Sequence, residues 1–301
     1  MLDKIYDRLL NLEIDVKKEQ PMCKYTTFNI GGPAEIFVTC NDVEELKNTV
    51  KIAKEFGVKP FIMGNGSNLL VSDKGMSGIV IKLSGDFNNI EVCDNKITAG
   101  SAAVLSKVSN AAHKNSLAGL EFAAGIPGTV GGALYMNAGA YGGQMADVVY
   151  KTLCMDCDGN IFEIIGDMHK FGYRESCFKN ADMYILSTEM HMSVGSKDEI
   201  EALMKDYNQR RKASQPLNLP SAGSVFKRPQ GNYAGTLIEK AGLKGKRIGG
   251  AEVSQKHAGF IVNVGGATAN DVISLVDYVK NEVYKMSGIM LEPEIRMVGI
   301  E

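Results

Sequence analysis

The chain has 301 residues, of which 45% are hydrophobic and 23% are charged, and its formal net charge is −2. This is the composition of an ordinary folded protein of two or three domains, and it excludes a chain dominated by disorder. Because 33 basic residues nearly balance 35 acidic ones, we expect no nonspecific binding to nucleic acid or anionic membranes. No apolar run approaches the ~20 residues that span a bilayer. Six cysteines without a secretion signal indicate a reducing compartment, so we expect a cytoplasmic protein.

The first predicted lobe, residues 1–85, mixes helices and strands. Asp42 and Glu45 have the spacing of a helix-capping pair, and Gly57 follows as a stop signal, which predicts a helix between them. A glycine-rich loop over 64–68 lies between two apolar strands rather than between a strand and a helix. The other predicted elements are an amphipathic helix over 1–12 and strands over 59–63, 69–71 and 78–83.

The second predicted lobe, residues 86–195, begins with alternating residues that predict a hairpin over 90–98, followed by a helix over 101–115. Residues 119–143 then contain eight glycines and one proline. At that density we expect no regular element. Strands are predicted over 148–154, 161–165 and 184–194, and an Asp158-Gly159 turn joins the first two.

The third predicted domain, residues 196–301, has helices on one face of a sheet, which makes the fold class α+β. Ser196 and Glu199 predict the start of a helix that ends near 210–212. The side chains expected to face inward from it are Ile200, Leu203, Met204 and Tyr207. Later elements are predicted as helices over 234–241 and 270–286 and strands over 259–264 and 294–300.

Two glycine-rich loops, residues 64–68 and 119–143, give the first indication of function. Backbone N–H groups in the first loop can hold pyrophosphate oxygens. The dinucleotide-binding fingerprint nevertheless fails, since residue 69 is not glycine, no helix follows and a phosphate-binding lysine is absent. A simple turn remains an alternative for this loop alone. The second loop is long and almost uncharged, and together the loops predict a flavin dinucleotide between the lobes, in preference to a purely structural loop.

Six motifs follow one another along residues 25–300. They are TTFNIGGP (26–33), GNGSN (64–68), GIPGTVGG (125–132), FGYRES (171–176), SAGSVFK (221–227) and LEPEIR (291–296). This series resembles the UDP-N-acetylenolpyruvoylglucosamine reductases, flavoenzymes of bacterial peptidoglycan precursor synthesis. The resemblance implies a two-lobed FAD-binding domain of the vanillyl-alcohol-oxidase type and a C-terminal α+β substrate domain. It also implies reduction of UDP-N-acetylglucosamine enolpyruvate to UDP-N-acetylmuramate, with hydride passing from NADPH through noncovalent FAD.

The resemblance assigns catalytic roles to three residues. Arg174 would face the substrate carboxylate and stabilise the developing enolate. Glu294 would share this stabilisation by hydrogen bonding, either as a protonated acid or through water. Ser224 would donate the proton, with Lys227 as a candidate to assist it. From the residues alone, an ordinary turn serine is the favoured interpretation of Ser224.

The remaining expected site residues bind the cofactor or the substrate. The expected cofactor-binding residues are Gly64, Asn65, Gly66, Ser67, Asn68, Ala124, Gly125, Ile126, Pro127, Gly128, Gly131 and Gly132. The expected substrate-binding residues, which can donate hydrogen bonds to anionic oxygens, are Tyr141, Lys227, Arg228 and His257. For His257, an ordinary surface histidine is an equally good interpretation.

Two further features of the sequence concern metal binding and the class within the resembled family. Cys154 and Cys157 have the spacing of zinc and thiol redox motifs, but no second ligand pair exists, so we expect no metal and no required disulfide. Asp182 follows Glu175 by only seven positions. Some members of the resembled family carry a segment there whose tyrosine covers the substrate, and this chain therefore resembles the shorter class without it.

Two alternative functions remain at this stage. The first is an FAD-dependent oxidase of the same fold that acts on an alcohol or sugar. Such oxidases commonly tether the flavin through a histidine in the loop corresponding to 64–68, and this loop contains none. The second is a noncatalytic nucleotide-binding module, but the joint presence of Arg174, Ser224 and Glu294 argues against it.

Overall fold

The computed structural model describes residues 1–300. Its internal contacts divide the chain into two compact units. Unit 1 comprises residues 1–18, 36–65 and 78–210, and unit 2 comprises 19–35, 66–77 and the chain from 211 onward. Unit 2 therefore includes two short segments from the N-terminal third of the chain. The division into domains at residues 85 and 195 stays a prediction.

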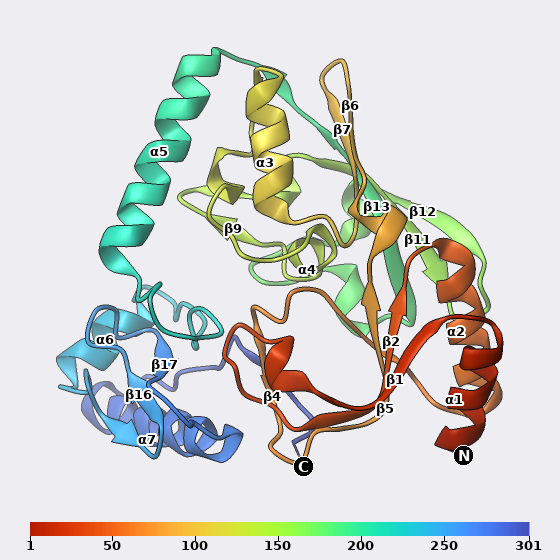
Figure 1. Ribbon diagram of the computed structural model, residues 1–301. Coiled ribbons are helices and arrows are strands. Elements are labelled where there is room, and N and C mark those ends of the chain that lie inside the picture. Colours follow the sequence, from red (N-terminus) through yellow and green to blue (C-terminus); the bar gives the residue numbers. More distant parts are fainter. Residues whose placement is uncertain (301) are drawn as a thin grey trace. The chain divides into compact units, whose positions relative to one another are not determined.

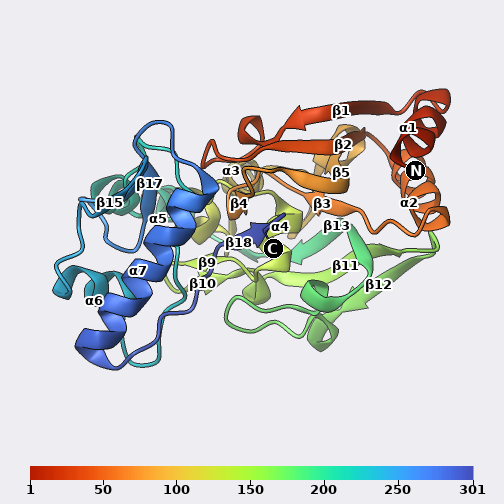
Figure 2. The ribbon, with the colours of Figure 1, turned by 90° about the horizontal axis from the view of Figure 1, so that it is seen from below.

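The first layer of unit 1 is a four-stranded sheet in the order β1-β2-β5-β3, in which β3 and β5 run parallel. Helices α1 and α2 lie beside this sheet (Figure 2), and their buried side chains, such as Ile5 and Leu46, share one core with Ile79 of β5. Asp42 accepts the N–H of Glu45 at 2.8 Å, so the predicted cap is confirmed. The elements are α1 (Leu2–Asn11), β1 (Asp15–Pro21), β2 (Pro33–Cys40), α2 (Val43–Glu55), β3 (Phe61–Met63) and β5 (Met76–Leu83).

The second layer of unit 1 is a five-stranded antiparallel sheet in the order β12-β11-β13-β7-β6 (Figure 1). The predicted hairpin is confirmed, and Asp94 at its turn has a left-handed φ of 52°. Helices α3 and α4 contribute buried residues to the core beside this sheet. The strands are β6 (Ile90–Cys93), β7 (Lys96–Gly100), β11 (Val149–Asp156), β12 (Ile161–Ile165) and β13 (Met183–His191). The other elements of this part are η2 (Gly85–Asn88), α3 (Leu105–Lys114), β8 (Leu117–Ala118), η3 (Glu121–Ala123), α4 (Val130–Tyr135), β9 (Gly139–Ala140), β10 (Gly143–Gln144), η4 (Met145–Asp147), η5 (Gly166–His169), η6 (Cys177–Asn180), β14 (Ser193–Val194) and α5 (Lys197–Ser214).

The expectation that residues 119–143 contain no regular element is wrong. Helix α4 begins within this segment, and Oγ1 of Thr129 accepts the N–H of Gly132 at 3.3 Å as its cap. Val130, Ala133 and Leu134 are buried by this helix. The cap and this burial offset the low helix propensity of glycine. A Cβ on Gly131 would lie 3.1 Å from the Ser101 backbone, so glycine also permits the close packing of the helix.

Two predicted helix details are also corrected. Helix α3 begins at Leu105 rather than near 101, because the carbonyl groups of Ser101 and Ala103 accept the N–H groups of Gly131 and Val130. Those carbonyl groups are therefore unavailable to a helix. Leu203 of α5, expected to face inward, is 44% exposed, whereas Ile200 and Met204 are buried.

Unit 2 contains a three-stranded antiparallel sheet, β15-β16-β17, and a parallel pair formed by β4 and β18. Helices α6 and α7 lie beside this sheet (Figure 2). Thr268 caps α7 in a reciprocal capping box with Asp271, and Gly288 ends the helix with a left-handed φ of 68°. Phe28 and Leu70 also belong to this core. The elements are η1 (Met22–Lys24), β4 (Leu69–Val71), α6 (Ala234–Lys240), β15 (Arg247–Ile248), β16 (Ala251–Val253), β17 (Ile261–Asn263), α7 (Ala269–Ser287) and β18 (Arg296–Val298).

Candidate functional site

The first two residues of the loop 64–68, Gly64 and Asn65, meet the second glycine-rich loop within unit 1. Asn65 donates from Nδ2 to the carbonyl oxygen of Pro127, 62 positions away in the chain, at 3.1 Å. A Cβ built on Gly64 would lie 2.4 Å from Oγ1 of Thr129. Only glycine permits this approach. The two loops that the sequence singled out are therefore in direct contact where they enter the candidate site.

The backbone amides of residues 65–68 donate no hydrogen bond to any residue that the structure describes. Gly66 is buried and has a left-handed φ of 61°. A Cβ on Gly66 would lie 2.2 Å from the carbonyl oxygen of Tyr25, so the protein's own backbone requires this glycine. Consecutive free amides in a turn form a concave site for anionic oxygens. The loop therefore fits a bound pyrophosphate.

The second glycine-rich loop presents open backbone at the start of α4. Gly132 is exposed, and the atom nearest to a Cβ built on it is Oγ1 of Thr129 at 3.6 Å. Gly128 is buried, and its carbonyl oxygen accepts the N–H of Leu105 at 3.0 Å. Gly132 thus leaves room for a ligand, whereas Gly128 is engaged by the protein. The expected cofactor-binding residues Ala124, Gly125 and Ile126 are half-buried, and Pro127 is exposed.

Arg174 lies in a tight turn of unit 1 with a left-handed φ of 56°. The turn is closed by two backbone hydrogen bonds between Gly172 and Glu175, of 3.0 and 3.2 Å. The guanidinium group lies over the ring of Tyr173 at 5.3 Å from its centroid and contacts the Gly139 carbonyl oxygen at 3.4 Å. A left-handed conformation is unfavourable for a residue other than glycine. The surrounding contacts must therefore hold this turn.

Asn137 supplies those contacts, although its sequence context gives no indication of this role. Its side chain is 2% exposed. Nδ2 donates to the Gly172 carbonyl oxygen at 2.9 Å, and Oδ1 accepts the N–H of Ala146 at 2.9 Å. The Ser176 hydroxyl group, on the other side of the turn, donates to the Tyr135 carbonyl oxygen at 2.8 Å. The Arg174 turn is therefore fixed to the second glycine-rich loop by side chains.

Ser224 lies in unit 2 on an extended segment, which runs between the segments that contain Phe260 and Pro293. This segment forms isolated β-bridges, Ser224 with Phe260 and Phe226 with Pro293. The Ser224 hydroxyl group is half-buried and donates to the Phe226 carbonyl oxygen at a long 3.3 Å. A hydrogen bond of this length is weak, so the hydroxyl group remains available to a ligand.

Glu294 is adjacent to Ser224 through this arrangement. Its N–H donates to the Val225 carbonyl oxygen at 2.7 Å. Its own carbonyl oxygen accepts a hydrogen bond from Nδ2 of Asn68 at 3.2 Å, and the N–H of Arg296 donates to the Asn68 carbonyl oxygen at 2.9 Å. Unit 2 therefore brings together two predicted catalytic residues and one residue of the first glycine-rich loop.

His257 is half-buried, and its ring and the Ser224 hydroxyl group both lie next to Gly259. A Cβ built on Gly259 would lie 3.0 Å from Cε1 of His257 and 3.5 Å from Oγ of Ser224. Nδ1 of His257 accepts the Gly259 N–H at 3.1 Å. Burial lowers the pKa of His257 below its ordinary value, which favours the neutral ring. The ring therefore lies beside the Ser224 hydroxyl group, with a pKa below that of an ordinary histidine.

Lys227 and Arg228 follow this segment and have local partners. The Lys227 ammonium group forms an ion pair with Glu292. The Arg228 guanidinium group lies 4.0 Å from the centroid of the exposed Tyr233 ring. Neither cation is buried, so both can exchange these partners for a ligand at small cost.

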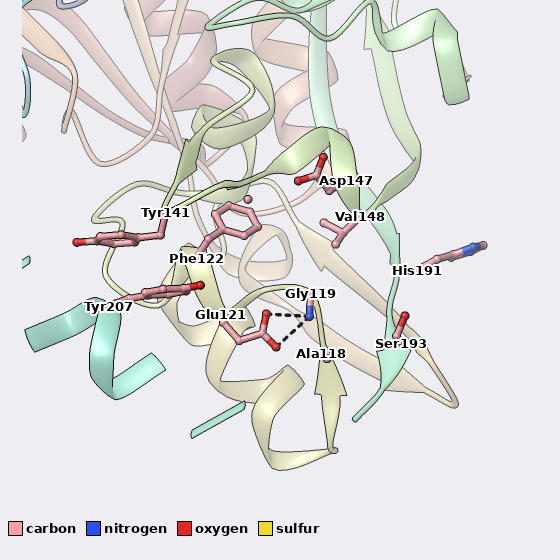
Figure 3. Close-up of a pocket in the computed structure, with 11 residues that line it drawn as sticks. Ala118, Gly119, Glu121, Phe122, Tyr141, Asp147, Val148, His191, Ser193 and Tyr207 are labelled. Atoms are coloured by element: carbon pink, nitrogen blue, oxygen red, sulfur yellow. Dashed lines mark hydrogen bonds between the residues drawn. The ribbon is translucent and has the colours of Figure 1, made fainter. Parts of the chain in front are cut away.

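Tyr141 lines a pocket of about 290 Å³ in unit 1 (Figure 3). Its ring stacks on Tyr207 of α5 with centroids 4.6 Å apart. Within this pocket the carboxylate of Glu121 accepts the Gly119 N–H at 3.0 and 3.1 Å. Of the predicted site residues that the structure describes, Tyr141 is the one that lines this pocket. Tyr207, expected only as a core residue, therefore contacts a candidate substrate-binding residue.

Two kinds of feature are absent from the residues that the structure describes. No group of three or more histidine, cysteine or acidic side chains is arranged to hold a metal ion. No helix in residues 1–300 combines the length and apolar character needed to cross a membrane. Cys154 is buried in β11, and Cys157 follows this strand.

Comparison with known proteins identifies the family. Residues 215–298 match the C-terminal domain of UDP-N-acetylenolpyruvoylglucosamine reductase, and residues 34–165 match an FAD-binding domain. The UDP-N-acetylenolpyruvoylglucosamine reductase of Clostridioides difficile (strain 630) is 48% identical over 297 residues, which cover 98% of each chain. The chain belongs to the UDP-N-acetylenolpyruvoylglucosamine reductase family. It is a flavoenzyme of peptidoglycan precursor synthesis that uses FAD and takes hydride from NADPH.

Solved structures agree with this family and fold. The UDP-N-acetylenolpyruvylglucosamine reductase from Thermus caldophilus has a TM-score of 0.82 and 36% identity, covering 95% of this chain and 98% of that one. The glucose dehydrogenase Phl p 4.0202 has a TM-score of 0.51 and 15% identity, covering 72% and 51% of the two chains. The second likeness concerns the fold alone, and the predicted two-lobed FAD-binding domain with a C-terminal α+β domain is confirmed.

The assignment to the shorter class stays a prediction. Between Glu175 and Asp182 the structure has η6 (Cys177–Asn180), a single 3₁₀ turn. The residues that the sequence interpretation missed in this reductase are Thr129 and Asn137. A threonine one residue before a predicted apolar helix would have signalled a cap, but the position of Asn137 depends on tertiary contacts.

Proposed function

We propose that Ser224, Arg174 and Glu294 carry out the reduction of the enolpyruvyl ether to the lactyl ether in this reductase. FAD, when bound and reduced, supplies the hydride to one alkene carbon. The protein must then stabilise the enolate that develops on the carboxylate and deliver a proton to the other carbon. The observation that carries the proposal is the contact of the Ser224 segment with Glu294 in unit 2.

Ser224 is proposed as the proton donor. Its hydroxyl group has only a weak internal acceptor, the Phe226 carbonyl oxygen at 3.3 Å, and can therefore turn toward a bound substrate. Lys227, the expected group to assist it, forms an ion pair with Glu292 in this structure.

Arg174 is proposed to bind the substrate carboxylate. A planar guanidinium group presents paired donors that match a carboxylate and strengthen as negative charge develops there. The fixed turn that carries Arg174 supports this role, because a preorganised cation needs no rearrangement during the reaction. Glu294 is proposed to share this stabilisation, and its backbone N–H bond to Val225 holds it next to Ser224.

The anionic diphosphate of the substrate is proposed to bind Tyr141, Lys227, Arg228 and His257. Lys227 and Arg228 offer cations with replaceable partners. NADPH also has a diphosphate and needs the same flavin face, so the two ligands would bind in turn and give ping-pong kinetics with substrate inhibition. We place these reactions in the cytoplasm, where nucleotide sugars and NADPH occur.

The cofactor-binding residues are proposed to divide between the loops. Residues 65–68 would hold the FAD pyrophosphate through their free amides, and residues 124–132 would lie near the isoalloxazine. The separate matches over 34–165 and 215–298 fit a substrate domain over 196–301, and the division of the FAD-binding part into lobes 1–85 and 86–195 stays a proposal.

An anaerobic spectrum of the holoenzyme tests the proposed reaction. NADPH should bleach the visible flavin absorbance, and UDP-N-acetylglucosamine enolpyruvate should restore it without oxygen. UDP-N-acetylglucosamine, which lacks the enolpyruvyl group, is the matched control and should leave the flavin reduced. Recovery of colour with this control, or none with the enolpyruvyl substrate, would overturn the proposal.

A further inference from the structure

Lys82 is a half-buried cation beside the first glycine-rich loop that neither the motifs nor the proposed mechanism uses. It lies in β5, where it pairs with Met63 of the parallel strand β3. Its neighbours Ile81 and Leu83 are buried in the core of the first layer. Because side chains alternate along a strand, Lys82 projects from the opposite face. Its Nζ lies 3.3 Å from the carbonyl oxygen of Gly64.

The charge of Lys82 has no anionic partner in the described part of the chain. Its ammonium group forms no ion pair within 4.0 Å, and its one hydrogen bond is to the neutral Gly64 carbonyl group. Burial lowers the pKa of Lys82 below its ordinary value. A shielded cation without a counter-charge is unfavourable. The site would therefore be stabilised by an anionic ligand.

The position of Lys82 indicates which anion this is. Gly64, which Lys82 contacts, is also the residue that packs against Thr129 of the second glycine-rich loop. The next residues, 65–68, have amides that bind nothing in the described chain. Lys82 therefore lies where the two loops meet, next to the start of the turn 65–68, whose amides suit anionic oxygens.

We propose that Lys82 provides the positive charge that binds the pyrophosphate of FAD. The ammonium group keeps its contact with the Gly64 carbonyl oxygen and uses another of its three N–H donors for a phosphate oxygen. It thus acts as the phosphate-binding lysine that the loop itself lacks, although Lys82 lies in β5, 14 positions after the loop ends. The proposal rests on FAD as the cofactor and is independent of the roles of Ser224, Arg174 and Glu294.

Titration of the apoprotein with FAD tests this inference. The variants are Lys82→Met, which removes the charge and the donors, Lys82→Gln, which keeps a donor for the Gly64 carbonyl group, and Lys82→Arg, which keeps the charge. Lys51→Met, at an exposed position of α2, is the control. The FAD dissociation constant should rise about 10- to 100-fold in both Lys82→Met and Lys82→Gln, the usual effect of losing a charge-assisted hydrogen bond. Lys82→Arg should recover most of the affinity, and Lys51→Met should match the wild type.

The other outcomes overturn the proposal in distinguishable ways. If Lys82→Gln binds FAD as the wild type does, the side chain only supports the Gly64 carbonyl group. If FAD affinity is unchanged in all variants but the KM for NADPH or the nucleotide substrate rises, Lys82 serves a different diphosphate. Thermal unfolding of each apoprotein variant is measured alongside. A Lys82→Arg variant that unfolds like the wild type yet binds FAD as weakly as Lys82→Gln would also contradict the proposal.

Discussion

The Arg174 turn and the Ser224 segment hold two predicted catalytic residues by different means. The Arg174 turn has a left-handed residue and depends on the side chains of Asn137 and Ser176. The Ser224 segment is extended and is held on both sides by backbone contacts with residues 259–260 and 292–294.

This difference determines how each region responds to substitution. Where backbone hydrogen bonds hold a segment, a side chain can be changed without moving it, so Ser224 can be tested by truncation. Where buried side chains hold a strained turn, a residue far from the reacting atoms can displace the catalytic group. In unit 2, the most damaging substitutions should therefore be those that crowd the backbone. In the Arg174 region, they should be those that remove a supporting side chain.

Gly66→Val should have the largest effect, because it places side-chain atoms against the backbone of unit 2. Its Cβ would lie 2.2 Å from the Tyr25 carbonyl oxygen at a left-handed φ of 61°. We expect little soluble, flavin-loaded protein, measured as yield and flavin content after purification. Gly142→Val is a control with a similar positive φ of 91° but open space around the Cβ. A Gly66→Val protein with full yield and full flavin occupancy would refute the proposed crowding.

Asn137→Ala should damage the Arg174 turn while leaving the Ser224 segment in place. The change leaves the Gly172 carbonyl group and the Ala146 N–H without their partner, at about 1–3 kcal/mol for each group that stays buried. We expect a lower thermal midpoint and slower flavin reoxidation by the nucleotide substrate, with smaller effects on reduction by NADPH.

The exposed Asn115, which follows α3 and whose Nδ2 donates to the Ala111 carbonyl oxygen, provides the matched control for Asn137. Asn115→Ala should change neither the thermal midpoint nor either half-reaction measurably. If Asn137→Ala were equally silent, the turn would not depend on that side chain and the contrast between the two regions would fail.

The smallest expected effect is a loss of stability at acidic pH. Burial lowers the pKa values of His169, in unit 1, and of His257, beside Ser224, below the ordinary value of 6.5. Each of these histidines is therefore protonated more readily in the unfolded state than in the folded state. The free energy of unfolding keeps its full value above pH 6.5 and decreases as the pH falls below it. The thermal midpoint should decrease between pH 7.5 and 5.5 on the order of a few degrees. His169→Gln should reduce that decrease, and an unchanged pH profile would contradict the assignment.

The features that could be predicted correctly from the sequence are those that depend on residues close together in the chain. The cap at Asp42, the hairpin turn at Asp94 and the glycine loop between two strands all follow from neighbouring residues. The prediction failed at α4, where burial of Val130 and Leu134 overrides glycine composition.

The same limit applies to the candidate site. The motifs indicated Ser224 and Glu294, and the fold brings their segments into contact. Lys82 and Asn137 could not be found from sequence because their significance comes from partners in distant segments, namely Gly64 across a parallel strand pair and Gly172 across 35 positions. An isolated lysine in a strand or asparagine in a glycine-rich loop carries no local signal of such a contact.

The central claim, that Ser224 donates the proton, is tested most directly by rapid-mixing measurements of the two half-reactions of Ser224→Ala. Flavin reduction by NADPH needs no proton from the serine and should proceed at close to the wild-type rate. Reoxidation by the enolpyruvyl nucleotide should slow about 10²–10⁴-fold, the usual effect of losing a positioned acid, and Ser224→Cys should recover part of that loss. If Ser224→Ala slowed both half-reactions equally, or neither, Ser224 would be a structural residue and another group would be the acid.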